Sequence, residues 1–389
     1  MRLGRAIRRY LYNVMALLWH NSWLLANGTS TIPRQGKQVC EFIQVKGRIM
    51  SDRAFTEREF IPVAGNPFGL VYSGAITENV EGEVNIHAIK YPYRDFFAVA
   101  NVYTPAGYDP NESYPAVVVA HPNGGMKDQV AGNYAQKLAE NGYIALAFDA
   151  AYQGENGGEP RSTDWPENRV EDIFRATDII MQFPGVDRER VAALGICGGG
   201  GYTFKAAQTD KRLKAVATLS LFNSGEVRRE GFRGSQADSI QERLAAASKA
   251  RQDEADGKNA ALTPNMCETV TPEQADAMPY DLYREGYYYY GRDAAHEGST
   301  FSYTVSSLMK LAAWDARQGA ELINVPLLMM MGSHADTGYM TIDCYEAAVN
   351  APVREIFEIP GATHIQTYWK PDYVSQAVGK LVEFFGSNL

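Results

Sequence analysis

The chain has 389 residues, of which 45% are hydrophobic and 21% charged, and its formal net charge is −9 at pH 7. This composition is typical of a globular protein long enough for one catalytic domain with an insertion, and the acidic balance argues against a nucleic-acid partner. The four cysteines, at positions 40, 197, 267 and 344, form no C-x-x-C pair and are too sparse for a disulfide framework, so a reducing compartment fits best.

The N-terminal segment differs from the rest of the chain. Residues 1–40 contain no Asp or Glu, and several of their apolar side chains fall on one helical face. One interpretation is an export signal with Leu11–Ala26 as its apolar region, and the other is a packing helix or surface arm. Asn13, His20 and Asn21 make the segment too polar to span a membrane. We therefore expect a cytoplasmic protein, with export through this basic segment as the alternative.

The first half of the chain, after an ambiguous stretch over 41–80, alternates between strand and helix patterns. Apolar runs separated by turn residues predict strands over 84–90, 96–103, 115–120, 144–148, 191–194 and 213–219. Apolar residues at helical spacing predict helices over 130–138, 170–181 and 202–207. We expect the first two strands to pair antiparallel around the turn at 91–95. Strands alternating with helices then predict parallel β-α-β units in a doubly wound sheet.

The alternation stops near Asn223, where about 90 residues with little strand character follow. They include a charged helical stretch, 237–256, and a cluster of aromatic residues that contains Tyr287, Tyr288, Tyr289 and Tyr290. The sheet pattern resumes over 325–331 and 353–359, and an amphipathic helix over 374–385 ends the chain. We predict an N-terminal extension over 1–80, a core over 81–222 and 313–389, and a helical cap over 223–312.

A glycine-rich turn joins the predicted strand 191–194 to the helix that follows. Residues 195–201 read Gly-Ile-Cys-Gly-Gly-Gly-Gly, which matches the G-x-S-x-G nucleophile elbow with Cys197 in place of serine. Side chains on the neighbours of the central residue would clash with strand and helix, which explains the glycines. The helix N-terminus favours a thiolate at Cys197. Taken alone, the motif is equally compatible with an inert buried cysteine or a phosphate-binding turn.

Other strand-end loops supply the partners that such a nucleophile needs. His364 follows the last strand, and Asp336 follows the strand before it, so Asp336 is placed to orient His364 as the base. His121-Pro122-Asn123-Gly124-Gly125 follows an early strand, where the backbone amides of Asn123 and Gly124 can bind an oxyanion together with that of Gly198.

Each of these assignments has an alternative. His334 is a rival base, although its position suggests a simple loop residue, and Asp343 is a rival acid inside the following helix. Asp149 ends a strand and is expected to brace the glycine-rich loop after it, as His121 is expected to support the oxyanion loop. A metal site at His334 and Asp336 is poorly supported because no third ligand is near in the sequence.

With these motifs assembled, the chain resembles the α/β-hydrolase superfamily, and most of all its dienelactone hydrolase-like members, whose elbow reads G-x-C-x-G-G. It is also similar to a group of bacterial hydrolases and fungal polyketide transferases that share stretches like those at 114–125 and 147–155. The resemblance covers roughly 80–220 and 320–389 and implies an α/β-hydrolase fold with a Cys197, Asp336, His364 triad. Dienelactone hydrolases proper lack so long an N-terminal extension and so large an insertion, which puts their substrate in doubt here.

The expected function is therefore hydrolysis of an ester, lactone or thioester through an acyl-enzyme on Cys197. Acyl transfer to an alcohol or amine is the alternative, and a non-catalytic binding protein on the same fold is a third hypothesis. Tyr287 to Tyr290 are expected either to bind a bulky apolar acyl group or to form the core of the cap. We expect a small-molecule acyl substrate, no cofactor, no metal and no membrane span, with a homodimer as one option for the assembly.

Overall fold

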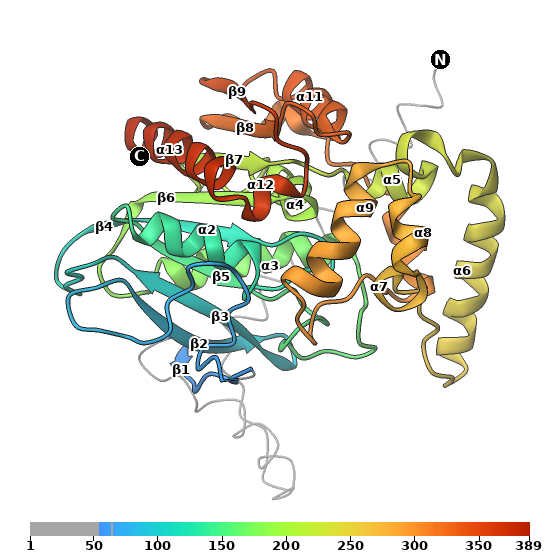
Figure 1. Cartoon of the computed structure of the whole chain (residues 1–389), viewed down its shortest axis with the longest axis horizontal. Helices are drawn as coiled ribbons and strands as arrows, with labels where there is room; N and C mark the ends of the chain where they lie inside the picture. The colour runs from blue at the N-terminus through green and yellow to red at the C-terminus, as the bar shows by residue number, and fades with distance from the viewer. Residues whose placement is uncertain (1–53, 64) are drawn as a thin grey trace, which may run out of the picture. The chain divides into compact units, whose positions relative to one another are not determined.

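A 9-stranded sheet forms the centre of the computed structural model, which describes residues 54–63 and 65–389 (Figure 1). The spatial order of the strands is β1-β2-β3-β5-β4-β6-β7-β8-β9. The strands are β1 (Thr56–Glu57), β2 (Asn85–Tyr93), β3 (Phe96–Thr104), β4 (Tyr114–Ala120), β5 (Ile144–Phe148), β6 (Val186–Ile196), β7 (Ala215–Leu219), β8 (Leu327–Gly332) and β9 (Arg354–Ile359). Every strand that the sequence predicts is present.

The sheet is antiparallel at one edge and parallel elsewhere. The strands β1, β2, β3 and β5 pair antiparallel in that order, which confirms the antiparallel pair predicted around residues 91–95. From β5 to β9 all pairs are parallel. Strands β5, β7 and β8 are buried along their whole length, as their unbroken apolar sequences require.

Helices cover both faces of the sheet. Right-handed crossovers place α2 (Val130–Ala139) on one face, and α3 (Pro166–Ile180), α4 (Gly198–Ala206) and α11 (Gly338–Ala347) on the other. The final helix, α13 (Pro371–Asn388), packs beside α2, and α3 packs beside α4 (Figure 1). The predicted doubly wound α/β-hydrolase fold is therefore present, with all the carboxyl ends of the parallel strands at one edge.

The long segment between β7 and β8 is helical, as predicted. Its helices are α5 (Ser224–Glu230), α6 (Ile240–Ala255), α7 (Met266–Thr269), α8 (Pro272–Asp276), α9 (Asp281–Tyr288), a π-helical turn (Tyr289–Asp293) and α10 (Leu308–Leu311). Short 3-10 turns lie at Phe232–Gly234, Ala237–Ser239, Val305–Ser307 and Ala320–Leu322. Within the sheet domain, α12 (Gln366–Trp369) is one further short helix, just before α13.

The cap is bound to the strand-end loops of the core. The Thr300 backbone N–H donates to the Gly124 carbonyl at 3.0 Å, and the Leu282 N–H donates to the Asp336 carboxylate at 3.1 Å. The Thr363 hydroxyl donates to Glu285 at 2.5 Å. Because these loops follow β4, β8 and β9, the cap covers the carboxyl edge of the sheet, and the two belong to one compact unit.

Part of the predicted N-terminal extension packs against the sheet. β1 pairs with β2, and the side chains of Phe55 and Leu70 are buried in the main hydrophobic core. The expectations for residues 1–40 lie outside the described residues. Within the part of the chain that the structure describes, no helix combines the length and hydropathy needed to cross a membrane.

Candidate active site

Cys197 occupies the sharp turn between β6 and α4. Its backbone has φ 55° and ψ −120°, a positive-φ conformation that residues with a Cβ rarely adopt. The Cys197 N–H donates to the Leu219 carbonyl, and its own carbonyl accepts from the Gly200 and Phe222 N–H groups at 2.9 Å each. A Cβ on Gly199 would lie 2.5 Å from the Ala120 carbonyl oxygen. The turn is therefore held by close backbone contacts that explain its glycines.

The Cys197 thiol is nearly buried, with 8% of the residue exposed. Burial raises the pKa of the thiol, while hydrogen bonding to the Tyr368 hydroxyl and to the backbone N–H groups of Gly198 and Asn123 partly offsets that effect. The expected lowering of the pKa by the helix N-terminus is thus outweighed by desolvation, so the free site holds a neutral thiol.

Two of the three predicted oxyanion groups face the sulfur. The amides of Asn123 and Gly198 both point at Cys197 and favour negative charge there. Gly124 instead uses its carbonyl, which accepts hydrogen bonds from the Thr300 N–H and the Ser299 hydroxyl of the cap. A Cβ on Gly124 would lie 2.1 Å from the Thr300 oxygen, so only glycine permits this contact.

His364 is fully buried. Its Nδ1 is 2.6 Å from the Thr337 hydroxyl, and its Nε2 is 2.8 Å from the Tyr368 hydroxyl. Burial lowers the pKa of His364 to about 3, so the imidazole is neutral in the free protein. The sequence reasoning missed Thr337 and Tyr368 as partners of His364, although they lie one residue after Asp336 and four residues after His364.

Asp336 does not make the predicted hydrogen bond to His364. One of its carboxylate oxygens accepts from the Leu282 N–H, and its backbone carbonyl accepts from Arg233. The other carboxylate oxygen is buried without a hydrogen-bond partner among the described residues. Thr337, the residue after Asp336, therefore faces the His364 ring, whereas the Asp336 carboxylate faces the cap.

The rival residues lie away from the thiol. His334 is exposed, and Asp343 lies within α11, where it pairs with Arg317 at 3.2 Å. Within 54–63 and 65–389, no group of three or more His, Cys, Asp or Glu side chains is arranged to hold a metal ion.

A small cavity of about 70 Å³ opens at Cys197. Its wall combines backbone and apolar side chains from the core and the cap: Asn123, Phe222, Arg228, Met266, Leu282, Tyr283, Gly286, Tyr290, Phe301, Ile365 and Tyr368. A larger cavity of about 310 Å³ shares Arg228, Met266, Tyr283 and Phe301 with it. The two cavities are therefore neighbours that share part of their walls.

Of the four consecutive tyrosines in the cap, only Tyr290 lines this cavity. The ring of Tyr289 is buried and packs edge-on against Tyr368, with the ring centroids 5.5 Å apart. The Tyr288 hydroxyl donates to Asp276 at 2.8 Å, and the Tyr287 ring packs on that of Tyr288. The cluster is thus divided between the pocket wall and the cap's own packing.

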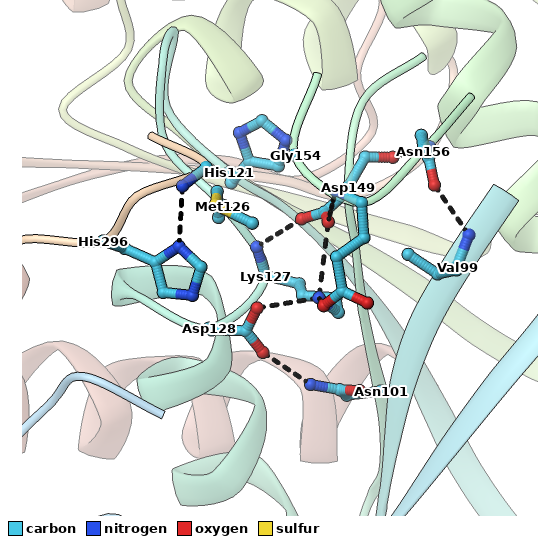
Figure 2. Close-up of polar contacts among 12 residues, drawn as sticks. Val99, Asn101, His121, Met126, Lys127, Asp128, Asp149, Gly154, Asn156 and His296 are labelled. Carbon is cyan, nitrogen blue, oxygen red and sulfur yellow. Dashed lines mark hydrogen bonds and ion pairs between the residues drawn. The ribbon is translucent and has the colours of Figure 1, made fainter. Parts of the chain in front are cut away.

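A buried charge cluster joins the loop after β4 to the loop after β5 (Figure 2). Lys127 is fully buried, and its ammonium is 2.7 Å from Asp128, 3.3 Å from Asp149 and 2.5 Å from Glu155. Burial alone would lower the pKa of Lys127, but these three carboxylates together raise it above its usual value. The cluster ties the oxyanion loop to the ends of β4 and β5.

His121 and Asp149 support these loops, as expected. Asp149 accepts hydrogen bonds from the Lys127 and Glu155 backbone N–H groups at 3.0 Å each. His121 donates from Nδ1 to the Pro122 carbonyl and accepts at Nε2 from the Ala150 N–H. Burial lowers the pKa of His121 to about 3, and this neutral tautomer satisfies both contacts.

Comparisons with known proteins identify the family of the chain. Residues 100–220 match the family model described as "Dienelactone hydrolase family". The chain is 35% identical over 294 residues to the uncharacterized protein YcjY of Escherichia coli, covering 75% of this chain and 94% of that protein. It is 34% identical over 131 residues to the thiohydrolase aneE of Aspergillus aculeatus, covering 34% of this chain and 41% of that protein.

A solved structure is similar over most of its length. The crystal structure of the hypothetical protein PA2218 from Pseudomonas aeruginosa has a TM-score of 0.71 and 28% sequence identity, and the match covers 80% of this chain and 96% of that one. On the family match, the similarity that covers 94% of YcjY and this shared fold, the protein is an α/β-hydrolase enzyme that belongs to the dienelactone hydrolase family.

Proposed function

We propose that the protein cleaves a carboxylic ester, lactone or thioester through an acyl-enzyme intermediate on Cys197. The observation that carries this proposal is the position of the thiol, which sits in the elbow turn with the Asn123 and Gly198 amides directed at it. A carbonyl attacked by Cys197 would place its developing negative charge beside these two donors.

His364 is the proposed base. Its Nε2 is hydrogen-bonded to the Tyr368 hydroxyl, which is in turn hydrogen-bonded to the Cys197 thiol. It would take the thiol proton as the carbon–sulfur bond forms, and return it to the leaving group when the tetrahedral intermediate collapses. Water activated by the same base would then attack the acyl-sulfur bond and release the acid.

Asp336 is the proposed acid of the triad, and we infer that it acts on His364 indirectly, through Thr337. Its carboxylate fixes the loop after β8 by accepting from Leu282, and the next residue, Thr337, contacts Nδ1 of His364. With Nδ1 donating to the Thr337 hydroxyl, Nε2 is the acceptor of the hydrogen bond from the Tyr368 hydroxyl and can take up a proton.

The two neighbouring cavities support a substrate with a compact group at the reacting carbonyl and a larger group beyond it. Arg228 lines both cavities, and its Nε is buried without a hydrogen-bond partner among the described residues. A substrate with an acceptor oxygen or a carboxylate a few bonds from the carbonyl would satisfy that donor.

Burial of the reacting groups favours a second candidate function. Cys197 is 8% exposed and His364 is fully buried, so an alcohol or amine bound in the cavity could reach the acyl-sulfur bond as readily as water. The acyl group would then be transferred rather than hydrolysed. The similarity to aneE, a thiohydrolase, favours hydrolysis of a thioester as the first candidate.

Trapping the acyl-enzyme tests this proposal. The protein is mixed with acyl p-nitrophenyl esters and acyl thioesters, with and without a terminal carboxylate, and mass spectrometry locates the acyl group and identifies the products. We expect acylation on Cys197, and none in Cys197→Ala, which should fold normally and lose turnover. Cys267→Ala, which alters a cysteine outside this site, is the matched control. Full activity in Cys197→Ala would overturn the proposal.

A further inference from the structure

The hydroxyl of Tyr368 stands between the proposed nucleophile and the proposed base. It lies 2.8 Å from Nε2 of His364 and is hydrogen-bonded to the Cys197 thiol. The ring nitrogens of His364 have these two described partners, Tyr368 and Thr337, and neither is the sulfur. A proton that leaves the thiol for His364 therefore meets the tyrosine oxygen first.

The tyrosine is held rigidly in this position. Tyr368 is 1% exposed and lies on α12, whose backbone is anchored to α2: the Asn133 side chain donates to the Tyr368 carbonyl at 3.2 Å, and the Tyr134 hydroxyl donates to the Thr367 carbonyl at 2.7 Å. The ring of Tyr289 packs edge-on against it from the cap. The hydroxyl is thus a fixed part of the site, placed by both the core and the cap.

We propose that Tyr368 is a further catalytic residue, which passes the proton between the Cys197 sulfur and Nε2 of His364. This inference rests on the proposed function. As the sulfur bonds to the substrate carbonyl carbon, the carbonyl π electrons move to oxygen. The thiol proton moves to the tyrosine oxygen while the tyrosine's own proton moves to Nε2.

The products of this step are a tetrahedral oxyanion, a neutral tyrosine and an imidazolium. When the intermediate collapses, the bond to the leaving group breaks, Tyr368 gives the proton that it received from the thiol to the leaving group, and Nε2 returns its proton to Tyr368. The water that attacks the acyl-sulfur bond would lose its proton along the same path. No oxidant, reductant or co-reactant is needed.

Burial makes a stepwise path through charged tyrosine unfavourable. Desolvation raises the pKa of Tyr368 well above its usual value, and the neighbouring Cys197 raises it further. A tyrosinate would therefore not accumulate, and in the proposed relay the two proton movements belong to one step. The same burial disfavours a resting thiolate–imidazolium pair, because it raises the pKa of Cys197 and lowers that of His364.

The variant Tyr368→Phe tests the relay, because it keeps the ring and removes the hydroxyl. With p-nitrophenyl acetate, whose leaving group needs no proton, the acylation burst reports deprotonation of the thiol. We expect this rate to fall by about 100-fold or more, the usual range for loss of general acid–base catalysis. Tyr143→Phe, which alters a buried tyrosine in the core, is the matched control and should retain the parent rate.

A structural role for Tyr368 would not change the way protons move, so two readouts separate the roles. In mixtures of H2O and D2O, the parent rate should depend on deuterium content with the curvature expected for two protons in flight, and a linear dependence would overturn the relay. If Tyr368→Phe does not fold, 3,5-difluorotyrosine at position 368 replaces it. Its more acidic hydroxyl should shift the pH–rate profile, and an unchanged profile counts against the relay.

The outcomes also distinguish this inference from the proposed function. Parent-like acylation in folded Tyr368→Phe, with Cys197→Ala inactive, removes the relay and leaves the Cys197 nucleophile in place. Activity in Cys197→Ala removes both. Loss of acylation in Tyr368→Phe, with an acyl group trapped on Cys197 in the parent, supports both.

Discussion

The Thr337 hydroxyl lies 2.6 Å from Nδ1 of His364, where a catalytic triad usually has a carboxylate. A hydroxyl orients the ring but stabilises an imidazolium less than a carboxylate would. A hydroxyl partner suits a ring that is itself neutral. Burial also keeps Tyr368 and the Cys197 thiol neutral, so none of these three groups carries charge in the free site.

Replacing Thr337 by Val should lower kcat/KM by about 10- to 100-fold, because leaving a buried donor without a partner costs roughly 1–3 kcal/mol. Thr337→Ser keeps the hydroxyl and is the control. Asp336→Asn should be milder, because an amide oxygen can still accept from the Leu282 N–H. Steady-state kinetics of the three variants measure this order. A severe loss in Asp336→Asn with little effect of Thr337→Val would mean that the carboxylate reaches His364 directly during turnover.

The cap tyrosines should differ in their effect on substrate choice. Tyr290→Ala enlarges the cavity beside Cys197, so the ratio of kcat/KM for a hexanoyl ester to that for an acetyl ester should change about tenfold, within the range for a methylene-sized change in a pocket. Tyr287 lies outside that wall and is half-buried, so Tyr287→Ala is the matched control and should keep the parent ratio. Equal ratios in all three proteins would place the acyl pocket elsewhere.

Two buried histidines should make stability depend on acid pH. Burial lowers the pKa of His121 and of His364 to about 3 in the folded state, below the ordinary value of 6.5. Between these values each of the two rings binds fewer protons in the folded than in the unfolded chain, so its contribution to the free energy of unfolding falls as pH falls from about 6.5 toward 3. Each histidine contributes a slope of about 1.4 kcal/mol per pH unit in that window.

Urea unfolding at pH 7, 6 and 5 measures this slope. His364→Gln removes one of the two titrating groups and should reduce the slope by about half of the histidine contribution. His334→Gln changes an exposed histidine and should leave the slope unchanged. A parent slope that His364→Gln does not alter would show that this ring is not held neutral in the folded protein.

The sheet could be predicted from the sequence because its strands are continuous apolar runs separated by turn signals. The run before His121 and the one at Ile144–Phe148 are buried along most of their length, and burial on both faces is a strong constraint. Cys197 and His364 could be placed because both follow such strands directly. The carboxyl ends of parallel strands meet at one edge whatever the side chains do.

The remaining details of the site depend on side-chain directions that no pattern encodes. Asp336 and Thr337 are adjacent, and the choice of which one faces His364 depends on the cap, whose Leu282 N–H takes the carboxylate. Tyr368 reaches the site because it lies on α12, about one helical turn after His364. In the cap, four consecutive tyrosines point in different directions, so their composition could not indicate that Tyr290 alone lines the cavity.

The last prediction concerns the charge cluster beneath the oxyanion loop. Lys127→Met removes the ammonium and leaves Asp128 and Asp149 buried without their shared counter-ion. Breaking a buried ion pair in this way costs about 3 to 5 kcal/mol, so the free energy of unfolding should fall by that amount at pH 7. Lys137→Met lies on the outer face of α2, where its pair with Glu140 is partly exposed, and should cost about 1 kcal/mol or less. Chemical denaturation of both variants measures the difference.

Because Asp149 also accepts from the Lys127 backbone N–H, the oxyanion loop should loosen in Lys127→Met, and acylation of Cys197 should slow in the fraction that remains folded. A stability loss no larger than that of Lys137→Met would mean that the carboxylates take up protons and no longer need the lysine.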